Sequence, residues 1–179
     1  MPITEVILVD EKDQPCGRME KMEAHRAGAL HRAFSIFIFN RKGEMLLQQR
    51  AKETYHSGGL WTNACCSHPI PGEKTKEAAQ RRLMEELGFC TEIQKVFDFL
   101  YKADFENGLT EHEFDHVFAG EYEGEINFNR DEVSEVCYQS IPEIRDLLGK
   151  QPQKFTAWFH LAFPRVENWW LQTYNGKPA

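Results

Sequence analysis

One stretch of the chain, residues 58–69, crowds small residues, a tryptophan, two thiols and an imidazole together. Its reactive side chains are Cys65, Cys66 and His68, and such groups serve proteins as nucleophiles, as acids or bases, and as metal ligands. Adjacent cysteines are poorly placed to chelate one ion together, so a cysteine-rich structural zinc site is not expected. The other interpretation is a buried loop with inert cysteines, and the stretch by itself leaves both open.

A second candidate is the sequence Glu111-His112-Glu113. If this segment begins a strand, alternate side chains share a face, so Glu111 and Glu113 lie side by side. Two neighbouring carboxylates repel each other unless a cation or a proton lies between them. Their oxygens, with nearby imidazoles, suit Mg²⁺, Mn²⁺ or Zn²⁺. A solvated strand edge is the alternative, and His25 and His31 carry no signal when each is taken alone.

The third candidate is a helix rich in glutamate and arginine. Glu73, followed after seven residues by Arg81–Phe89, is similar to the Nudix box. That motif runs Gly, five residues, Glu, seven residues, Arg-Glu-apolar-any-Glu-Glu-any-Gly-apolar, and its helical glutamates hold the metal that binds a diphosphate. The chain departs from the motif where Ser67 replaces the first glycine and Arg82 replaces a metal-binding glutamate. A solvated helical face with salt bridges is the alternative, but the spacing through Gly88 favours the box.

These candidates must be positioned by a mixture of strands and helices. Apolar patterns bounded by turn residues predict strands at Thr4–Val9, Ala33–Phe39, Met45–Gln49, Ile93–Tyr101, Glu113–Ala119 and, more weakly, Glu132–Tyr138. Asn40–Gly43 supplies a hairpin turn between the second and third strands, and Asp10–Gly17 reads as a turn region.

Three helices are expected. The glutamate-rich helix has Thr75 as a candidate cap and ends before Gly88. Its buried stripe consists of Ala79, Leu83 and Leu87. One further helix begins near Pro142, and another spans Lys154–Gln172 with a bend or break at Pro164. Strands mixed with a few helices predict an α/β or α+β sandwich.

Composition narrows the class of partner. The 179 residues suit a single domain, residues 1–179, and the net charge of −7 argues against nucleic acid or an anionic membrane as the main partner. A small anionic substrate is still compatible, because a few local cations override the average. Residues 1–11 show no secretory signal, and five cysteines without one predict reduced thiols in the cytoplasm. We expect a monomer or a weak homodimer.

Together the candidate segments resemble type I isopentenyl-diphosphate isomerase, from about Val6 to Trp158. The segments that carry the resemblance are Leu30–Ser35, Trp61–Pro69, Glu85–Gly88 and Glu111–Glu113. Their order and spacing make chance agreement improbable. The resemblance implies a Nudix-like fold, a mixed β-sheet sandwich flanked by helices. It also implies interconversion of isopentenyl diphosphate and dimethylallyl diphosphate, in which one end of an allylic system gains a proton and the other loses one.

The resemblance implies a role for individual residues. The family holds a metal, here expected to be Mn²⁺ or Zn²⁺, with three histidines and two glutamates, which correspond to His25, His31, His68, Glu111 and Glu113. The catalytic groups correspond to Cys66, to Glu113 assisted by Tyr101, and to Trp158, whose ring faces the carbocation. A Trp face stabilises a cation by roughly 0.5–2 kcal/mol without offering a nucleophile that would trap it.

The diphosphate needs its own anchor. By resemblance, Glu86 holds a Mg²⁺ ion that bridges the diphosphate, and Lys21, Arg50 and Arg82 supply positive charge. A further family lysine falls at Thr54, for which Lys52 is a candidate substitute. The main alternative function is a Nudix hydrolase of a nucleoside diphosphate derivative, against which Arg82 and the acid/base set argue. A non-catalytic, metal-stabilised binding protein is the second alternative.

Overall fold

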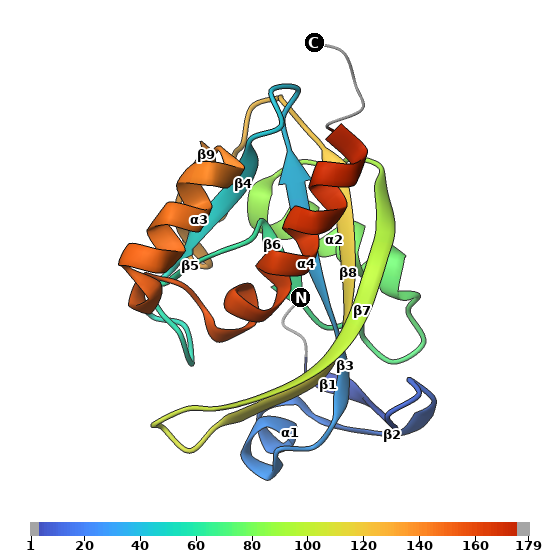
Figure 1. Cartoon of the computed structure of the whole chain (residues 1–179). Helices are drawn as coiled ribbons and strands as arrows, with labels where there is room; N and C mark the ends of the chain where they lie inside the picture. Colours follow the sequence, from blue (N-terminus) through green and yellow to red (C-terminus); the bar gives the residue numbers. More distant parts are fainter. Residues whose placement is uncertain (1–3, 175–179) are drawn as a thin grey trace.

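The computed structural model describes residues 4–174, which form a mixed β-sheet covered by helices (Figure 1). The strands are β1 (Glu5–Val9), β2 (Pro15–Glu20), β3 (His31–Phe39), β4 (Met45–Arg50), β5 (Trp61–Thr62), β6 (Cys65–Ser67), β7 (Ile93–Asp104), β8 (Thr110–Glu121) and β9 (Val133–Gln139). The helices are α1 (Lys21–Ala27), α2 (Thr75–Leu87), α3 (Ile141–Lys150) and α4 (Ala157–Tyr174), with a short 3-10 turn, η1 (Pro152–Lys154). This α+β architecture is the one expected.

Strand β3 lies at the centre of the sheet. It pairs in antiparallel fashion with β1, β4 and β6, and in parallel fashion with β8 along its full length. The long strands β7 and β8 form a hairpin that curves past α4 toward α1 (Figure 1). Segments that are far apart in the sequence therefore meet on β3.

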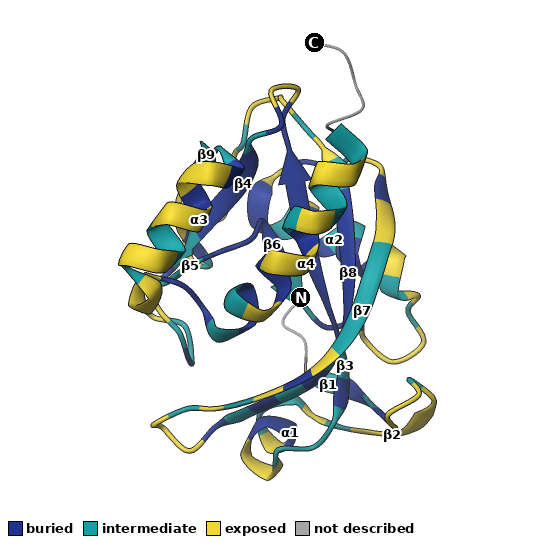
Figure 2. Ribbon diagram, viewed as in Figure 1, coloured by how far each residue is buried: buried dark blue, intermediate teal, exposed yellow. Residues whose placement is uncertain are grey.

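Each face of β3 has its own apolar core. Phe34, Ile36 and Ile38 face a cluster that includes Leu83 of α2, whereas Phe37 and its neighbours on the other face pack against α3 and α4. The alternation follows from the two-residue period of a strand. Both faces are buried, so β3 and the strands beside it are almost wholly dark in Figure 2, while the helices are exposed on their outer sides.

Helix α2 forms where the Nudix-like motif was recognised. Its buried residues are Ala78, Ala79, Arg82, Leu83, Glu86 and Leu87. The helix ends at Gly88, whose φ of 74° is left-handed and whose position leaves a Cβ only 2.5 Å from the Asn127 carbonyl oxygen. The expected cap at Thr75 is wrong, because the N-cap is Lys74 and makes no side-chain hydrogen bond to the helix.

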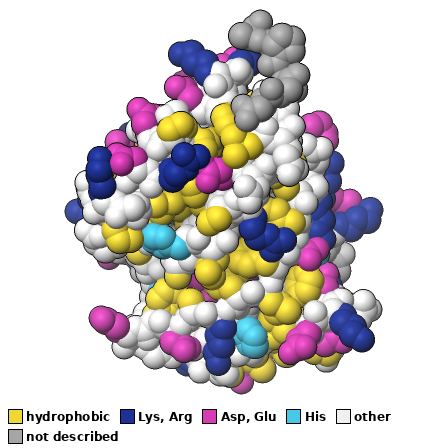
Figure 3. All heavy atoms as spheres, viewed as in Figure 1, with side chains coloured by type: hydrophobic (Ala, Val, Ile, Leu, Met, Phe, Trp, Pro, Cys, Tyr) yellow, Lys and Arg dark blue, Asp and Glu magenta, His cyan; other side chains and the backbone are white. Residues whose placement is uncertain are grey.

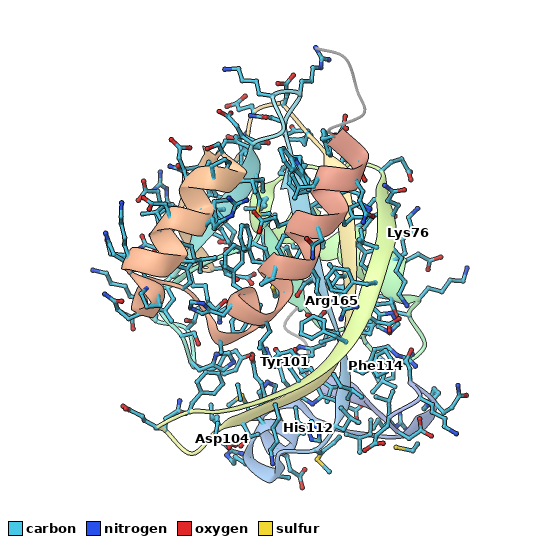
Figure 4. All side chains as sticks on the ribbon, viewed as in Figure 1. Lys76, Tyr101, Asp104, His112, Phe114 and Arg165 are labelled. Atoms are coloured by element: carbon cyan, nitrogen blue, oxygen red, sulfur yellow. The ribbon has the colours of Figure 1, made fainter. Side chains whose placement is uncertain are left out.

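Helix α4 closes the opposite face. A bend or a break was expected at Pro164; the break does not occur, because α4 continues through Pro164 and buries Phe163 and Val166 on either side. Arg165 of α4 lies over the ring of Phe97 in β7, 4.1 Å from its centroid, and joins the helix to the hairpin (Figure 4). In the space-filling view, hydrophobic side chains gather in the middle of this face (Figure 3).

Several short elements were not predicted. Helix α1 and strands β5 and β6 are absent from the expected elements, and β2 begins at Pro15, inside the expected turn region. Strands β7 and β8 extend to Asp104 and from Thr110, beyond their expected bounds. Within residues 4–174, no helix combines the length and apolar character needed to cross a bilayer.

Candidate active site

The site lies where β3, β6 and β8 run side by side. His31 of β3 is opposite Glu113 of β8, and Ser35 of β3 is opposite Cys66 of β6. Helix α1 adds Lys21 and His25 from a third direction. This short helix is held at its start by the Glu20 carboxylate, which accepts from two backbone amides, and at its end by Gly28 in the left-handed conformation.

Four of the predicted ligands form one tight cluster. One ligand atom from each of His25, His31, His68 and Glu113 lies within 4.8 Å of all the others. His31 Nε2 is 3.2 Å from His68 Nε2, and Glu113 Oε1 is 2.9 Å from His68 Nε2 and 3.5 Å from His31 Nε2. Adjacent ligands held about 2.0–2.2 Å from a common ion lie roughly 3 Å apart. The spacing of these side chains therefore fits a divalent ion.

Backbone carbonyls orient two of these imidazoles. His25 Nδ1 is 2.7 Å from the carbonyl oxygen of Lys21, and His31 Nδ1 is 2.8 Å from that of Ala29. A ring whose Nδ1–H donates to a carbonyl directs Nε2 into the cluster, which is the usual second contact of a ligating histidine. His25 Nε2 is buried and has no hydrogen-bond partner among the described residues.

Charge shows what the cluster requires. Burial lowers the pKa of His68 to about 3 and that of His25 to about 4, so both rings are neutral near pH 7. Burial also opposes a charge on His31, but contact with Glu113 outweighs it and raises the pKa of His31. The buried carboxylate thus draws positive charge into the cluster, and a divalent cation is well suited to supply it.

Glu111 lies apart from the four-residue cluster. It belongs to a second group, formed with His25 and His56, and its Oε1 is 3.0 Å from His56 Nε2. The Tyr101 hydroxyl is 2.9 Å from Glu111 Oε2 and 2.6 Å from Glu113 Oε2. Burial and the neighbouring Glu113 charge raise the pKa of Glu111. Because a phenol has only one proton, Tyr101 can donate to one carboxylate at a time.

The two adjacent cysteines face different surroundings. Cys66 Sγ donates to Asn63 Oδ1 at 3.1 Å and lies 3.4 Å from Ser35 Oγ. Burial and the nearby Asp115 carboxyl raise the pKa of Cys66, so its thiol keeps its proton at neutral pH. Cys65 is fully buried in the core beneath α2, as strand alternation requires.

Cys66 and Glu113 line the same small pocket. Its wall consists of Ser35, Arg50, Tyr55, His56, Cys66, Ser67, His68, Tyr101, Glu111, Glu113 and Trp158. Trp158 is buried at the start of α4, with the Arg50 guanidinium 5.4 Å from its ring centroid. Tyr101 is labelled in Figure 4, with Asp104 and His112 farther along the same hairpin.

A larger cavity of about 240 Å³ adjoins this pocket and shares Arg50, Tyr55, Cys66, Ser67 and His68 with it. Its charged lining residues are Lys21, Arg50, Arg82, Glu86 and Glu132. Arg82 donates to Glu86 Oε1 at 2.7 Å and pairs with Glu132, while Gln48 Nε2 donates to Glu86 Oε2 at 3.2 Å. Burial, followed by the charges of Arg82 and Arg50, lowers the pKa of Lys21. The lining therefore carries three cationic side chains against two carboxylates, a small excess of positive charge that suits an anion.

The position of the expected family lysine lies in this cavity wall. Thr54 lines the cavity, and its Oγ1 lies 3.0 Å from the carbonyl oxygen of His56. Lys52 is exposed and is not among the lining residues. The structure therefore does not bring Lys52 into the position that a lysine at residue 54 would occupy.

Sequence reasoning missed several polar residues of the site. These residues are Ser35, Gln48, Tyr55, His56, Asn63, Asp115 and Glu132. Asn63 lies within residues 58–69, but an amide beside two thiols and an imidazole gives no separate signal of a role. His56 precedes a serine and two glycines, a turn signal that did not indicate a buried imidazole.

Comparisons with known proteins agree with this geometry. Residues 29–159 match the NUDIX domain family. The chain is 53% identical over 170 residues to the isopentenyl-diphosphate Delta-isomerase of Pectobacterium atrosepticum, covering 95% of each chain. It is 48% identical over 161 residues to the enzyme of that name from Burkholderia multivorans, covering 90% of this chain and 92% of the relative.

Solved structures support the fold. A Deinococcus radiodurans protein of known crystal structure matches 82% of this chain and 90% of its own, with a TM-score of 0.69 and 18% identity. The MutT protein of Methanosarcina mazei matches 83% of this chain and 96% of its own, with a TM-score of 0.64 and 22% identity. At these identities the likeness concerns the arrangement of strands and helices alone.

Proposed function

Because the chain belongs to the NUDIX domain family and, within it, to the isopentenyl-diphosphate Delta-isomerases, we propose that it isomerises isopentenyl diphosphate to dimethylallyl diphosphate in isoprenoid biosynthesis. One observation carries the mechanism. A protonated thiol, Cys66, and a carboxyl, Glu113, line one buried pocket from strands on either side of β3. The cation-lined cavity beside this pocket has room for a diphosphate.

Substrate binding begins with the diphosphate. Lys21, Arg50 and Arg82 bind its oxygens, and Glu86 would hold a Mg²⁺ ion, which when bound would add positive charge beside the diphosphate. The cavity's mixture of cations and one buried carboxylate supports this assignment. With the diphosphate in the larger cavity, the hydrocarbon end extends into the small pocket. Most residues that line that pocket are buried, and exclusion of water protects a carbocation.

Proton transfer then proceeds in two steps. The Cys66 thiol gives its proton to the terminal CH₂ carbon of the alkene, which becomes a methyl group and leaves a tertiary cation. Glu113 removes a proton from the CH₂ group on the other side of the cationic carbon, and that C–H electron pair forms the new double bond. Tyr101 hydrogen-bonds to Glu113, and the Trp158 ring stabilises the cation. No electrons are gained or lost overall.

The histidine cluster holds the carboxylates in place. His25, His31, His68, Glu111 and Glu113 are the proposed ligands of a Mn²⁺ or Zn²⁺ ion, which when bound offsets the repulsion between the two buried carboxylates. The spacing of His25, His31, His68 and Glu113 and the unpartnered His25 Nε2 support this role, and Glu111 belongs to the neighbouring group that shares His25.

Arg82 separates this activity from hydrolysis. A Nudix hydrolase uses glutamates of the motif to bind metal, whereas here one of those positions is a guanidinium paired with Glu86 and Glu132. The arginine guanidinium binds the phosphoanhydride oxygens by hydrogen bonds and does not add a metal ion that would activate water. Hydrolysis of a nucleoside diphosphate derivative is therefore not the favoured function.

The direct test is incubation of the purified chain with isopentenyl diphosphate and Mg²⁺ in D₂O, followed by NMR. We expect dimethylallyl diphosphate carrying deuterium in a methyl group. Release of inorganic phosphate or pyrophosphate without the isomer would contradict the proposal. Monomer or weak homodimer remains our prediction for the oligomeric state, and sedimentation at several concentrations tests it.

A further inference from the structure

His56 has no role in the mechanism above, yet it lies in the same pocket. It belongs to the loop between β4 and β5, and its side chain is only 2% exposed. Its ring stacks on Phe105 with centroids 4.7 Å apart and an interplanar angle of 8°. A second contact places it edge-on to Trp158, 6.0 Å between centroids. A polar ring buried among aromatics needs a partner for each nitrogen.

Only one of its nitrogens has such a partner. His56 Nδ1 is 3.2 Å from Ser57 Oγ, but Nε2 has no partner of acceptable hydrogen-bond geometry among the described residues. That Nε2 nevertheless lies 3.0 Å from Glu111 Oε1. His25 Nε2 is likewise buried and unpartnered, and the three ligand atoms lie within 4.8 Å of one another. A cation would satisfy this group, in which the unpartnered His25 Nε2 and the poorly aligned His56 Nε2 converge with a Glu111 oxygen.

The spacing within this group matches the spacing of the neighbouring cluster. The 3.0 Å between His56 and Glu111 falls between the 2.9 Å and 3.2 Å contacts that His68 makes with Glu113 and His31. The two groups share His25, so they are neighbours. His56 comes from the loop between β4 and β5, and Glu111 comes from β8, the strand that also carries Glu113.

The backbone around His56 is built to hold it. Ser57 adopts a left-handed φ of 53°, which is strained for a residue with a side chain. At Gly58 a Cβ would lie 2.4 Å from the Lys52 carbonyl oxygen, so that position must be glycine. Asn107, at the tip of the β7–β8 hairpin, donates to the Tyr55 carbonyl oxygen at 3.0 Å. The loop is thus braced from both sides with His56 turned inward.

We propose that His56 is a further ligand of the metal centre, binding beside Glu111. The inference deepens the proposed function, since it concerns the ion that serves the same site. A fourth imidazole moves the donor set toward nitrogen, which favours Mn²⁺, Co²⁺ or Zn²⁺ over Mg²⁺ at this position.

The test is Co²⁺ binding to the full chain after removal of metal, by chelator competition and visible absorption. His56→Phe keeps the ring stacked on Phe105 but removes both nitrogens. His56→Gln keeps an amide N–H that can still donate to Glu111. His160→Phe is the matched control, because the His160 ring lies away from both groups, with Nε2 2.8 Å from the Pro152 carbonyl oxygen at the exposed side of α4. We expect both His56 variants to bind Co²⁺ about tenfold or more weakly with altered absorption, and the control to match the parent.

Two results would overturn the proposal. Recovery of parental affinity and spectrum in His56→Gln alone means that His56 only orients Glu111 by a hydrogen bond. Parental affinity in both variants means that it does not serve the metal at all. If circular dichroism shows that the variants do not fold, the proposal is tested instead by NMR of the unmodified protein with Co²⁺ bound. Four paramagnetically shifted imidazole N–H signals in the Co²⁺ form support the proposal, and three refute it.

Failure of this inference is distinguishable from failure of the proposed function. Co²⁺ binding is measured without substrate, so it does not depend on isomerisation. A parent that forms dimethylallyl diphosphate while the His56 variants keep parental Co²⁺ affinity loses only the His56 proposal. A parent that needs His56 for Co²⁺ but forms no isomer loses only the proposed reaction.

Discussion

The neighbouring thiols allow a crossed experiment, with Cys66→Ala and Cys65→Ala made side by side. Cys66 Sγ faces Ser35 and Asn63 at the pocket, whereas Cys65 is wholly buried in the core under α2. The two substitutions remove the same atom from adjacent residues. Because the two sulfur atoms have different surroundings, Cys66→Ala should affect the rate of isomerisation and Cys65→Ala should affect the stability of the fold.

For Cys66→Ala we expect a loss of turnover of about 10²–10⁴-fold, the usual contribution of a general acid, equal to roughly 2.7–5.4 kcal/mol of barrier. Affinity for the diphosphate should change little, because Lys21, Arg50 and Arg82 remain. For Cys65→Ala we expect parental turnover. Its free energy of unfolding should fall by about 1 kcal/mol, because the packing contacts of one buried sulfur atom are lost.

The assays are single-turnover isomerisation followed by NMR and urea unfolding of the same two proteins. We expect Cys66→Ala to isomerise slowly with parental stability, and Cys65→Ala to isomerise at the parental rate with lower stability. If Cys66→Ala isomerises at the parental rate and Cys65→Ala is inactive, the general acid is Cys65 and not Cys66. Full activity in both variants would eliminate thiol catalysis from the mechanism.

Other consequences follow from the charged cavity and from α2. Arg82→Glu should raise KM steeply and lower turnover, because it places another carboxylate beside a buried one; unchanged substrate affinity by calorimetry would contradict the role. Thr54→Lys should lower KM by adding a cation to the cavity wall, while Lys52→Ala, at an exposed position, should leave KM unchanged; equal effects would refute the placement. Arg81 lowers the pKa of Glu73 through two contacts of 2.7 and 2.8 Å. The pair therefore stabilises the fold at pH values above the ordinary carboxyl pKa, and this contribution is lost as the pH falls and Glu73 becomes protonated. Glu73→Gln should thus cost about 0.5–1 kcal/mol at pH 7 and nothing near pH 2 in urea unfolding; a cost independent of pH would show that packing, not charge, is responsible.

The parts of the fold that local patterns determine could be predicted. Helix α2 has its apolar residues one turn apart and a glycine at its end, and both signals lie within the helix itself. The turn at Asn40–Gly43 likewise joins β3 and β4 as expected. Strand β6 has only three residues and exists because it pairs with β3. No period can be read from so short a segment, and its partner lies far away in the sequence.

The same distinction applies to the candidate site. Cys66, His68 and Glu113 were found because they lie in segments whose order resembles a known family. His56 was missed because its burial depends on Phe105 and Asn107, which come from a hairpin beyond α2. Asp115 was missed for a similar reason, since its partner Ser35 lies on another strand. Contacts between distant segments leave no local trace in composition or spacing.

The parallel pairing of β3 with β8 has a consequence for how the chain reaches its native state. This pairing joins residue 31 to residue 113 and closes a long loop before any of its contacts can form. Loop closure costs entropy that grows with length, by about 0.6 kcal/mol for each doubling. Non-local parallel pairing is also slow to form. His31 and Glu113 should therefore meet late in folding, so a nascent chain would acquire its secondary structure before it could bind a metal ion tightly.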